Sequence, residues 1–185
     1  MFEFILSCFY FFLPAYFTNM TPSLTASLTV FNSFGKPIDN NKQFKGKPLL
    51  GNHKTWRGLI LGPIAGILIL FLQKWLFNNC VSAREISFLN YQEIGLYFGF
   101  LMVFGAVLGD LFFAFIKRRL DLKPGAKFMP FDQINYVLGA GFFLNLFSEI
   151  KIDFKVWTTL LILTFALHIA ATQIGFRMGL SKNKW

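Results

Sequence analysis

Five apolar runs divide this chain and constrain its fold more than any other feature. They cover about residues 2–20, 57–77, 93–116, 131–148 and 156–176. The core of a lipid bilayer takes roughly 20 residues of α-helix, and the fourth run, with about 18, lies within the usual range. Backbone groups in lipid must find partners inside their own segment, so such runs fold as helices. The sequence therefore predicts an all-α, polytopic integral membrane protein with a single membrane domain over residues 1–185, in agreement with its 55% hydrophobic composition.

Positive charge is concentrated in alternate segments between the runs. Of the 18 Lys and Arg residues, 14 lie in the loop 32–56 with Arg57 at its edge, in the loop 117–130, and in the C-terminal tail. Cytoplasmic loops carry an excess of Lys and Arg. This bias predicts five transmembrane helices in the inner (plasma) membrane of the cell, with the N-terminus outside. The C-terminus and both basic loops are then cytoplasmic.

The first run is interpreted as a membrane span and not as a signal peptide. It lacks a basic leading segment, since its only early charge is Glu3. Pro14, Asn19 and Pro22 predict a kink or a break near its inner end. In the second run, glycines recur every four residues and are expected to let another helix approach closely. They are Gly58, Gly62 and Gly66.

Two carboxylates begin and end the stretch between the third and fourth runs. Asp110 lies inside the third run, where a charge costs about 2.5–3.5 kcal/mol on insertion scales and is a functional candidate by default. The competing interpretation is a structural ion pair, for instance with Lys117, two turns along the same helix face. Asp132 opens the fourth run, where an acid is often only a favourable cap. The short loop, with its turn at Pro124–Gly125, returns Asp132 to the depth of Asp110, so we expect both acids at one site that can hold a divalent cation.

Cations accompany both acids. The loop after the third run supplies Lys117, Arg118, Arg119 and Lys127. Arginine can hold phosphate in a fork and lysine as a point charge, although the topology rule alone also places cations there. The stretch from Gly51 to Gly58 reads GNHKTWRG, and it has the glycines, cations and hydroxyl of a phosphate loop without Walker A spacing. Its alternative interpretation is an interfacial tryptophan flanked by topology-determining cations. Acids and cations together suit a metal-bound polyphosphate at the membrane face.

Two histidines stand apart from this pattern. His168 lies in the fifth run, with Thr164 and Thr172 one turn to either side. Such a polar stripe more often joins helices by hydrogen bonds than carries out chemistry. His53, in the first basic loop, has no predicted partner.

At this point the chain resembles the archaeal-type CDP-archaeol synthases, which transfer a cytidylyl group from CTP to a lipid phosphate. The resemblance covers most of the chain and rests on the order and spacing of several short motifs. They are Pro37-Ile38-Asp39, Gly51 with Lys54-Thr55-Trp56-Arg57-Gly58, Gly109-Asp110, Phe115-Ile116-Lys117-Arg118-Arg119, Pro124-Gly125, Pro130, Asp132-Gln133 and Gly139-Ala140.

The resemblance implies an activity and a set of site residues. CTP and a lipid phosphate such as 2,3-bis-O-geranylgeranylglycerol 1-phosphate would react to give a CDP-lipid and pyrophosphate, with Mg²⁺ as cofactor. Asp110 and Asp132 match the metal-binding acids, and these two with Lys117 are the catalytic candidates. The nucleotide-binding candidates are Lys54, Thr55, Arg57, Lys117, Arg118, Arg119 and Lys127.

Two alternatives to this activity stay open. One is a phosphatidate cytidylyltransferase acting on ester lipids, because the lipid-facing surface is uniformly Phe, Leu and Ile. The other is a non-enzymatic scaffold whose basic loops bind anionic lipids of the bilayer. No nucleic-acid partner is expected, and the sequence does not fix the oligomeric state.

Overall fold

The computed structural model describes residues 1–122 and 126–177. The predicted turn at Pro124–Gly125 and the basic tail residues Lys182 and Lys184 lie outside the described residues. Within those residues the chain is mostly helical, and its only strands form one short hairpin. The all-α class is therefore confirmed.

Five long helices lie over the five apolar runs. They are α1 (Phe2–Leu24), α2 (Trp56–Asn79), α4 (Leu96–Arg119), α5 (Phe131–Phe147) and α6 (Phe154–Arg177). Among the described residues, α1, α2, α4 and α6 are the four helices long and apolar enough to cross a membrane. Helix α5 has 17 residues, which corresponds to about 26 Å at a rise of 1.5 Å per residue, so by length it falls short of the other four.

Of the kink or break predicted near the inner end of the first run, the break does not occur, because helix α1 continues through its prolines, while the kink stays a prediction. The helix includes both Pro14 and Pro22 and ends at Leu24. A proline in a helix leaves the carbonyl four residues earlier without its donor. For Pro14 that carbonyl belongs to Tyr10, and it accepts a hydrogen bond from Gln73 Nε2 of α2. The neighbouring helix thus supplies the missing donor, as helices in membranes commonly do for one another.

Glycines set the spacing of two helix pairs. A Cβ added to Gly62 of α2 would lie 2.7 Å from the carbonyl oxygen of Thr18 in α1, which confirms the expected packing role of this glycine. Between α4 and α5, a Cβ added to Gly109 would lie 2.8 Å from the Cα of Gly139. The α4 and α5 backbones therefore touch next to Asp110, and any larger residue would push them apart.

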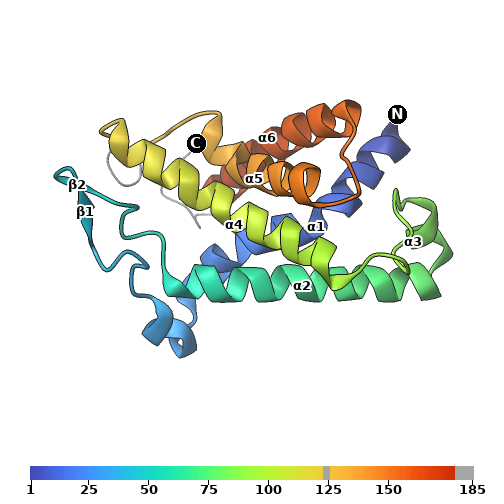
Figure 1. Ribbon diagram of the computed structural model, residues 1–185, viewed down its shortest axis with the longest axis horizontal. Helices are drawn as coiled ribbons and strands as arrows, with labels where there is room; N and C mark the ends of the chain where they lie inside the picture. Colours follow the sequence, from blue (N-terminus) through green and yellow to red (C-terminus); the bar gives the residue numbers. More distant parts are fainter. Residues whose placement is uncertain (123–125, 178–185) are drawn as a thin grey trace.

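Loops and helix termini gather at one end of the molecule. After α1 come two 3₁₀ turns, η1 (Thr25–Ser27) and η2 (Thr29–Phe34). A hairpin of β1 (Gln43–Phe44) and β2 (Lys47–Pro48) then lies beside the last turn of α4 and not far from the start of α2 (Figure 1). The short helix α3 (Val81–Glu85) lies at the opposite end (Figure 1).

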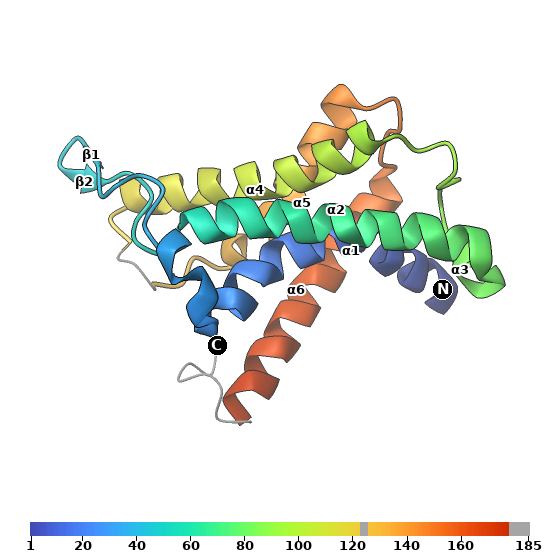
Figure 2. The same cartoon turned by 90° about the horizontal axis from the view of Figure 1, so that it is seen from below.

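Helix α6 crosses the other helices steeply instead of running alongside them (Figure 2). Its buried Thr164 shares a hydrogen bond of 2.9 Å with the Tyr16 hydroxyl of α1, deep in the core. His168 follows one turn later on α6. This core contact therefore fixes the position from which His168 reaches the loop-bearing end of the molecule.

Candidate functional site

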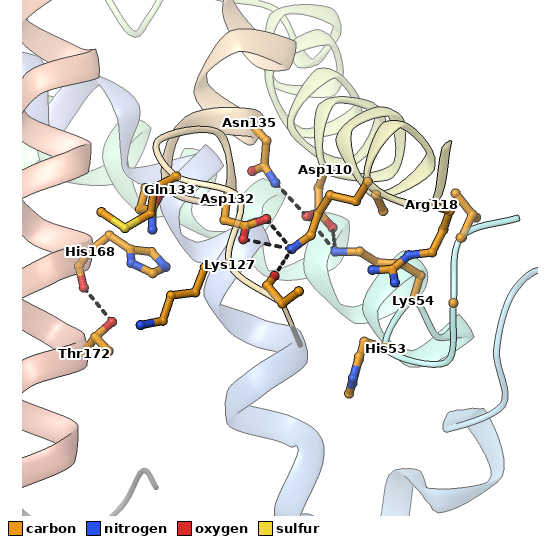
Figure 3. Close-up of a pocket in the computed structure, with 16 residues that line it drawn as sticks. His53, Lys54, Asp110, Arg118, Lys127, Asp132, Gln133, Asn135, His168 and Thr172 are labelled. Carbon is orange, nitrogen blue, oxygen red and sulfur yellow. Dashed lines mark hydrogen bonds and ion pairs between the residues drawn. The ribbon is translucent and has the colours of Figure 1, made fainter. Parts of the chain in front are cut away.

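A charged pocket of about 340 Å³ opens where the ends of four segments meet. Its walls come from the loop before α2, the second half of α4, the start of α5 with the segment preceding it, and α6. Figure 3 shows His168 and Thr172 on α6 at one side, Lys54 at the other, and Asp110 and Asp132 between them. Six charged residues line it: Lys54, Asp110, Lys117, Arg118, Lys127 and Asp132.

Asp110 is held by groups from two other segments. It lies nine residues before Arg119, the last residue of α4. Lys54 Nζ, from the loop before α2, donates to both carboxylate oxygens at 2.7 and 2.6 Å. Asn135 Nδ2 of α5 donates to Oδ1 at 3.1 Å (Figure 3). The Asp110 side chain is 28% exposed and that of Lys54 is 25% exposed, so the pair faces the pocket instead of being sealed in the core.

Asp132 has an equivalent arrangement with a different lysine. It is the second residue of α5, where the free N–H groups of a helix start favour an anion. Its Oδ2 accepts the Phe128 N–H at 2.8 Å. Lys117 Nζ donates to both carboxylate oxygens at 2.9 and 2.8 Å and to the Ala126 carbonyl at 2.7 Å. Lys117 therefore ties α4 to the segment that leads into α5.

These contacts differ from the ion pair between Asp110 and Lys117 that the sequence suggested as an alternative. Lys117 pairs with Asp132, and Asp110 pairs with Lys54. Both carboxylates are thus neutralised by lysines that also line the pocket.

Cations outnumber carboxylates in the pocket by four to two. Arg118 is 7% exposed, and within the described residues its guanidinium forms no ion pair. Its NH1 donates to the Leu122 carbonyl, while its Nε has no partner. Lys127 lines the same pocket. A buried cation without a counter-ion is costly, so the surplus of positive charge predicts an anionic ligand.

The loop around Gly51 is fixed by the buried carboxylate of Asp39. Asp39 accepts the N–H groups of Asn41 at 3.0 Å, Leu50 at 2.9 Å and Gly51 at 3.1 Å. Burial by itself would raise the pKa of Asp39, but these backbone hydrogen bonds lower it below its ordinary value. Gly51 has φ of +98°, and a Cβ there would lie 3.6 Å from Arg118 Nε. The loop thus covers the Arg118 guanidinium closely.

The structure places three predicted ligand residues outside the charged pocket. Thr55 caps α2, its Oγ1 accepting the Gly58 N–H at 3.4 Å. Arg57 donates to the Ala26 carbonyl at 3.5 Å. Arg119 points away to the hairpin, where NH1 donates to the Phe44 carbonyl at 2.6 Å and the guanidinium stacks on the rings of Phe44 and Phe115.

Several pocket residues were not singled out as site residues from the sequence. His53 and His168 both line the pocket, as do Gln133 and Asn135. Asn135 lies one turn after Asp132, and this spacing was an available signal that its side chain would face the same way. His168 had no such signal, because its placement depends on the crossing of α6 over α1.

Within residues 1–122 and 126–177, no group of three or more His, Cys, Asp or Glu side chains is placed to hold a metal ion. The pocket offers two carboxylates. Mg²⁺ is usually bound through one or two carboxylates together with substrate phosphates and water, and not by an all-protein cage. The donor set therefore fits a Mg²⁺ that arrives with a phosphate ligand.

Comparison with known proteins gives matches over the whole chain. The family model described as CarS-like, CDP-archaeol synthase, matches residues 1–185. A CDP-archaeol synthase of Methanococcoides burtonii is 34% identical over 181 residues, covering 94% of this chain and 99% of the relative. One from Archaeoglobus fulgidus is 32% identical over 188 aligned positions and covers all of both chains.

A solved structure has a similar fold. It is described as an intramembrane enzyme for archaeal membrane lipids biosynthesis. The two structures superpose with a TM-score of 0.69 over 90% of each chain, at 26% sequence identity.

Proposed function

This chain belongs to the CDP-archaeol synthase family, and we propose that the charged pocket is the site of its reaction. The chain is a membrane-embedded cytidylyltransferase that uses CTP and an archaeal lipid phosphate, and it gives a CDP-lipid and pyrophosphate. Family membership displaces the alternative of a non-enzymatic scaffold. The assignment of the pocket rests on one observation above all, its surplus of two positive charges around two lysine-paired carboxylates.

The cationic side chains are suited to a polyphosphate. Arg118 presents a guanidinium that forms no ion pair within the described part of the chain, and Lys127 adds a point charge. Arginine favours forked contacts with phosphate oxygens, and lysine stabilises developing charge without strict geometry. Lys54 and Lys117 can exchange their carboxylate partners for phosphate oxygens without leaving the pocket. Arg119 serves instead to hold the hairpin against α4.

Asp110 and Asp132 would hold Mg²⁺ when CTP is bound. A Mg²⁺ held there would supply positive charge that offsets the charge of the triphosphate. Asn135 keeps the Asp110 carboxylate oriented through its hydrogen bond. The helix start around Asp132 restrains that carboxylate in the same way.

The transfer itself requires no nucleophile from the protein. An oxygen of the lipid phosphate forms a bond to the α-phosphorus of CTP. The bond from that phosphorus to the oxygen bridging the α- and β-phosphates breaks, and pyrophosphate leaves with the electron pair. Arg118, Lys117 and Lys127 would stabilise the charge that collects on pyrophosphate as it departs.

We also propose a topology of five membrane spans for this chain. Helix α5 would complete five membrane spans despite its length, and an odd number of spans puts the N-terminus outside when the C-terminus is cytoplasmic. The hairpin and the loop 117–130 are then cytoplasmic, on the side that supplies CTP. This orientation is supported by the 14 of 18 Lys and Arg residues that it puts in the cytoplasm.

Turnover of purified protein tests the proposed pocket. The protein is incubated with labelled CTP, Mg²⁺ and either 2,3-bis-O-geranylgeranylglycerol 1-phosphate or phosphatidate. We expect a CDP-lipid with the ether lipid and preference for CTP over ATP and GTP. Asp132→Asn is expected to lower turnover by roughly 10²–10³-fold.

Asp121→Asn is the matched control. Asp121 also pairs with a lysine, Lys47, at 2.6 Å, but its side chain is 75% exposed and outside the pocket. Exposed pairs contribute about 0–1 kcal/mol, so this variant should keep its turnover. Equal turnover with ATP, or equal losses in the two variants, would contradict the proposed site.

A further inference from the structure

The connection between α1 and α2 begins with a stretch that carries no charge. Residues 24–35 read LTASLTVFNSFG, and they form the end of α1, then η1 and η2. Leu28, Val30 and Phe34 are exposed, Val30 over 81% of its surface. Single exposed apolar residues are common, but several on one short segment indicate an interaction surface. None of these three residues lines the charged pocket, so the surface requires a different partner.

Hydrogen bonds hold this stretch beside the first turn of α2. Arg57 NH1 donates to the Ala26 carbonyl at 3.5 Å, and the Trp56 N–H donates to the Lys36 carbonyl at 3.1 Å. Figures 1 and 2 show the blue segment after α1 level with the start of α2 along the helix axis, whereas the hairpin extends farther. Helix α2 is long and apolar enough to cross a membrane from Trp56 onward. The stretch therefore lies at the depth where α2 enters the membrane.

The residues that flank this stretch are those expected at a membrane surface. Trp56 is exposed, and tryptophan is enriched at the level of the lipid headgroups. Lys36 and Arg57 form no ion pair within the described residues. The hydrogen bond from Arg57 to the Ala26 carbonyl is long, so it holds the guanidinium only weakly. Both cations can therefore contact the anionic headgroups of a cytoplasmic leaflet.

We propose that residues 24–35 and Trp56 form an interfacial anchor that inserts its apolar side chains into the cytoplasmic leaflet. Lys36 and Arg57 bind the phosphates of anionic phospholipids at its edge. The choice of leaflet rests on the proposed topology, whereas the insertion does not. The anchor follows directly on Met20 and Leu24, two exposed apolar residues at the end of α1. Its apolar surface thus continues the surface of a membrane span.

A soluble protein is the less suitable partner for this surface. To reach it, such a protein would have to enter the headgroup region beside α1 and α2, where lipid is present in large excess. In water the same apolar side chains would be costly to expose. The bilayer covers them without any further chain, and its anionic headgroups complement the two cations.

The anchor also adjoins the loop that leads to the charged pocket. The last turn of α1 packs closely on α2, since a Cβ added to Gly58 would lie 3.2 Å from the Pro22 side chain. Thr55 caps the same turn of α2. The next residue back, Lys54, reaches Asp110. Insertion of the anchor therefore fixes one end of the Lys54 loop at the membrane surface.

Fluorescence quenching in lipid nanodiscs tests the insertion. Full-length protein without cysteines carries one fluorophore at Val30→Cys, at Phe34→Cys or, as the control, at Lys42→Cys in the segment before the hairpin. The quenchers are phospholipids brominated on their acyl chains and iodide in the water. Because bromine quenches only a fluorophore that reaches the hydrocarbon, we expect bromine quenching at positions 30 and 34. The fluorophore at position 42 should instead be quenched by iodide.

The headgroup of the brominated lipid tests the two cations. With the fluorophore at Val30→Cys, phosphatidylglycerol should quench at a lower mole fraction than phosphatidylcholine. A cation near an anionic surface contributes enough for a preference of about 5-fold each. The double variant Lys36→Gln with Arg57→Gln should lose this preference. The matched control, Lys42→Gln with Lys45→Gln, also removes two cations from the same loop and should keep it.

Two results would overturn the proposal. If the fluorophores at positions 30 and 34 are quenched by iodide and not by bromine, the stretch lies in water and its partner is a protein. Equal quenching by the two brominated lipids in the protein with both cations would refute the headgroup contacts. CTP turnover is measured on the same preparations, so a failure of the anchor is distinguished from a failure of the proposed function.

Discussion

Replacing Asp110 and Lys54 singly and together separates a catalytic role of Asp110 from a structural one. Asp110 accepts two hydrogen bonds from Lys54 and one from Asn135. Asp110→Asn keeps the size and one acceptor oxygen but removes the charge. Hydrogen bonds to charged groups contribute about 1.5–3 kcal/mol each when buried. About a quarter of each side chain is exposed, and solvent weakens the pair, so we expect a total loss of about 1–3 kcal/mol of stability.

That loss is too small to inactivate the protein by unfolding. Folded proteins are stable by about 5–15 kcal/mol, so nearly all Asp110→Asn molecules stay folded. Loss of a group that acts in the transition state costs roughly 10²–10³-fold in rate. Turnover per folded molecule should therefore fall by that factor while the melting temperature falls by only a few degrees.

The double variant, Asp110→Asn with Lys54→Met, separates the catalytic role of Asp110 from a structural role. Removing both partners leaves no unpaired charge, so its stability should recover relative to the sum of the two single losses. Turnover should stay as low as in Asp110→Asn. Thermal unfolding and turnover are measured on the same detergent preparations across a Mg²⁺ titration. If turnover recovers together with stability in the double variant, the pair is structural and the proposed metal role of Asp110 is wrong.

Three other predictions follow from the fold and its loops. In a cysteine-free background, Lys42→Cys should resist an impermeant thiol reagent added outside intact cells and Asn79→Cys should react; the reverse pattern would invert the topology. Gly139→Ala should cost about 1–3 kcal/mol by thermal unfolding, because its Cβ would lie 2.6 Å from the Gly109 Cα; an unchanged melting temperature would contradict the close α4–α5 contact. The lowered pKa of Asp39 stabilises the loop above about pH 4, and that contribution is lost as the pH falls further. Asp39→Asn should therefore weaken the acid-side dependence of CTP binding, and an identical pH profile would refute the role of Asp39.

Apolar length and glycine spacing were sufficient to predict most of the fold. Both signals are local, because a helix in lipid satisfies its own backbone and a glycine needs only a close neighbour. The continuity of α1 through Pro14 was not predictable in this way. It depends on Gln73, 59 positions later in the chain, which donates to the freed Tyr10 carbonyl. The hairpin was also missed, since its strands have two residues each and carry no recognisable alternation.

The acids of the site were predictable, but their partners were not. Sequence spacing made Lys117 the natural partner of Asp110, seven residues along one helix face. The close approach of Gly109 to Gly139 brings Asn135 against Asp110. The Asp39 network fixes the loop before α2, from which Lys54 reaches the same carboxylate. Lys117 is then drawn to the start of α5, where Asp132 and the Ala126 carbonyl both accept from it. Each pairing depends on contacts between helices, so a single sequence indicates which charges meet but not which of them bind each other.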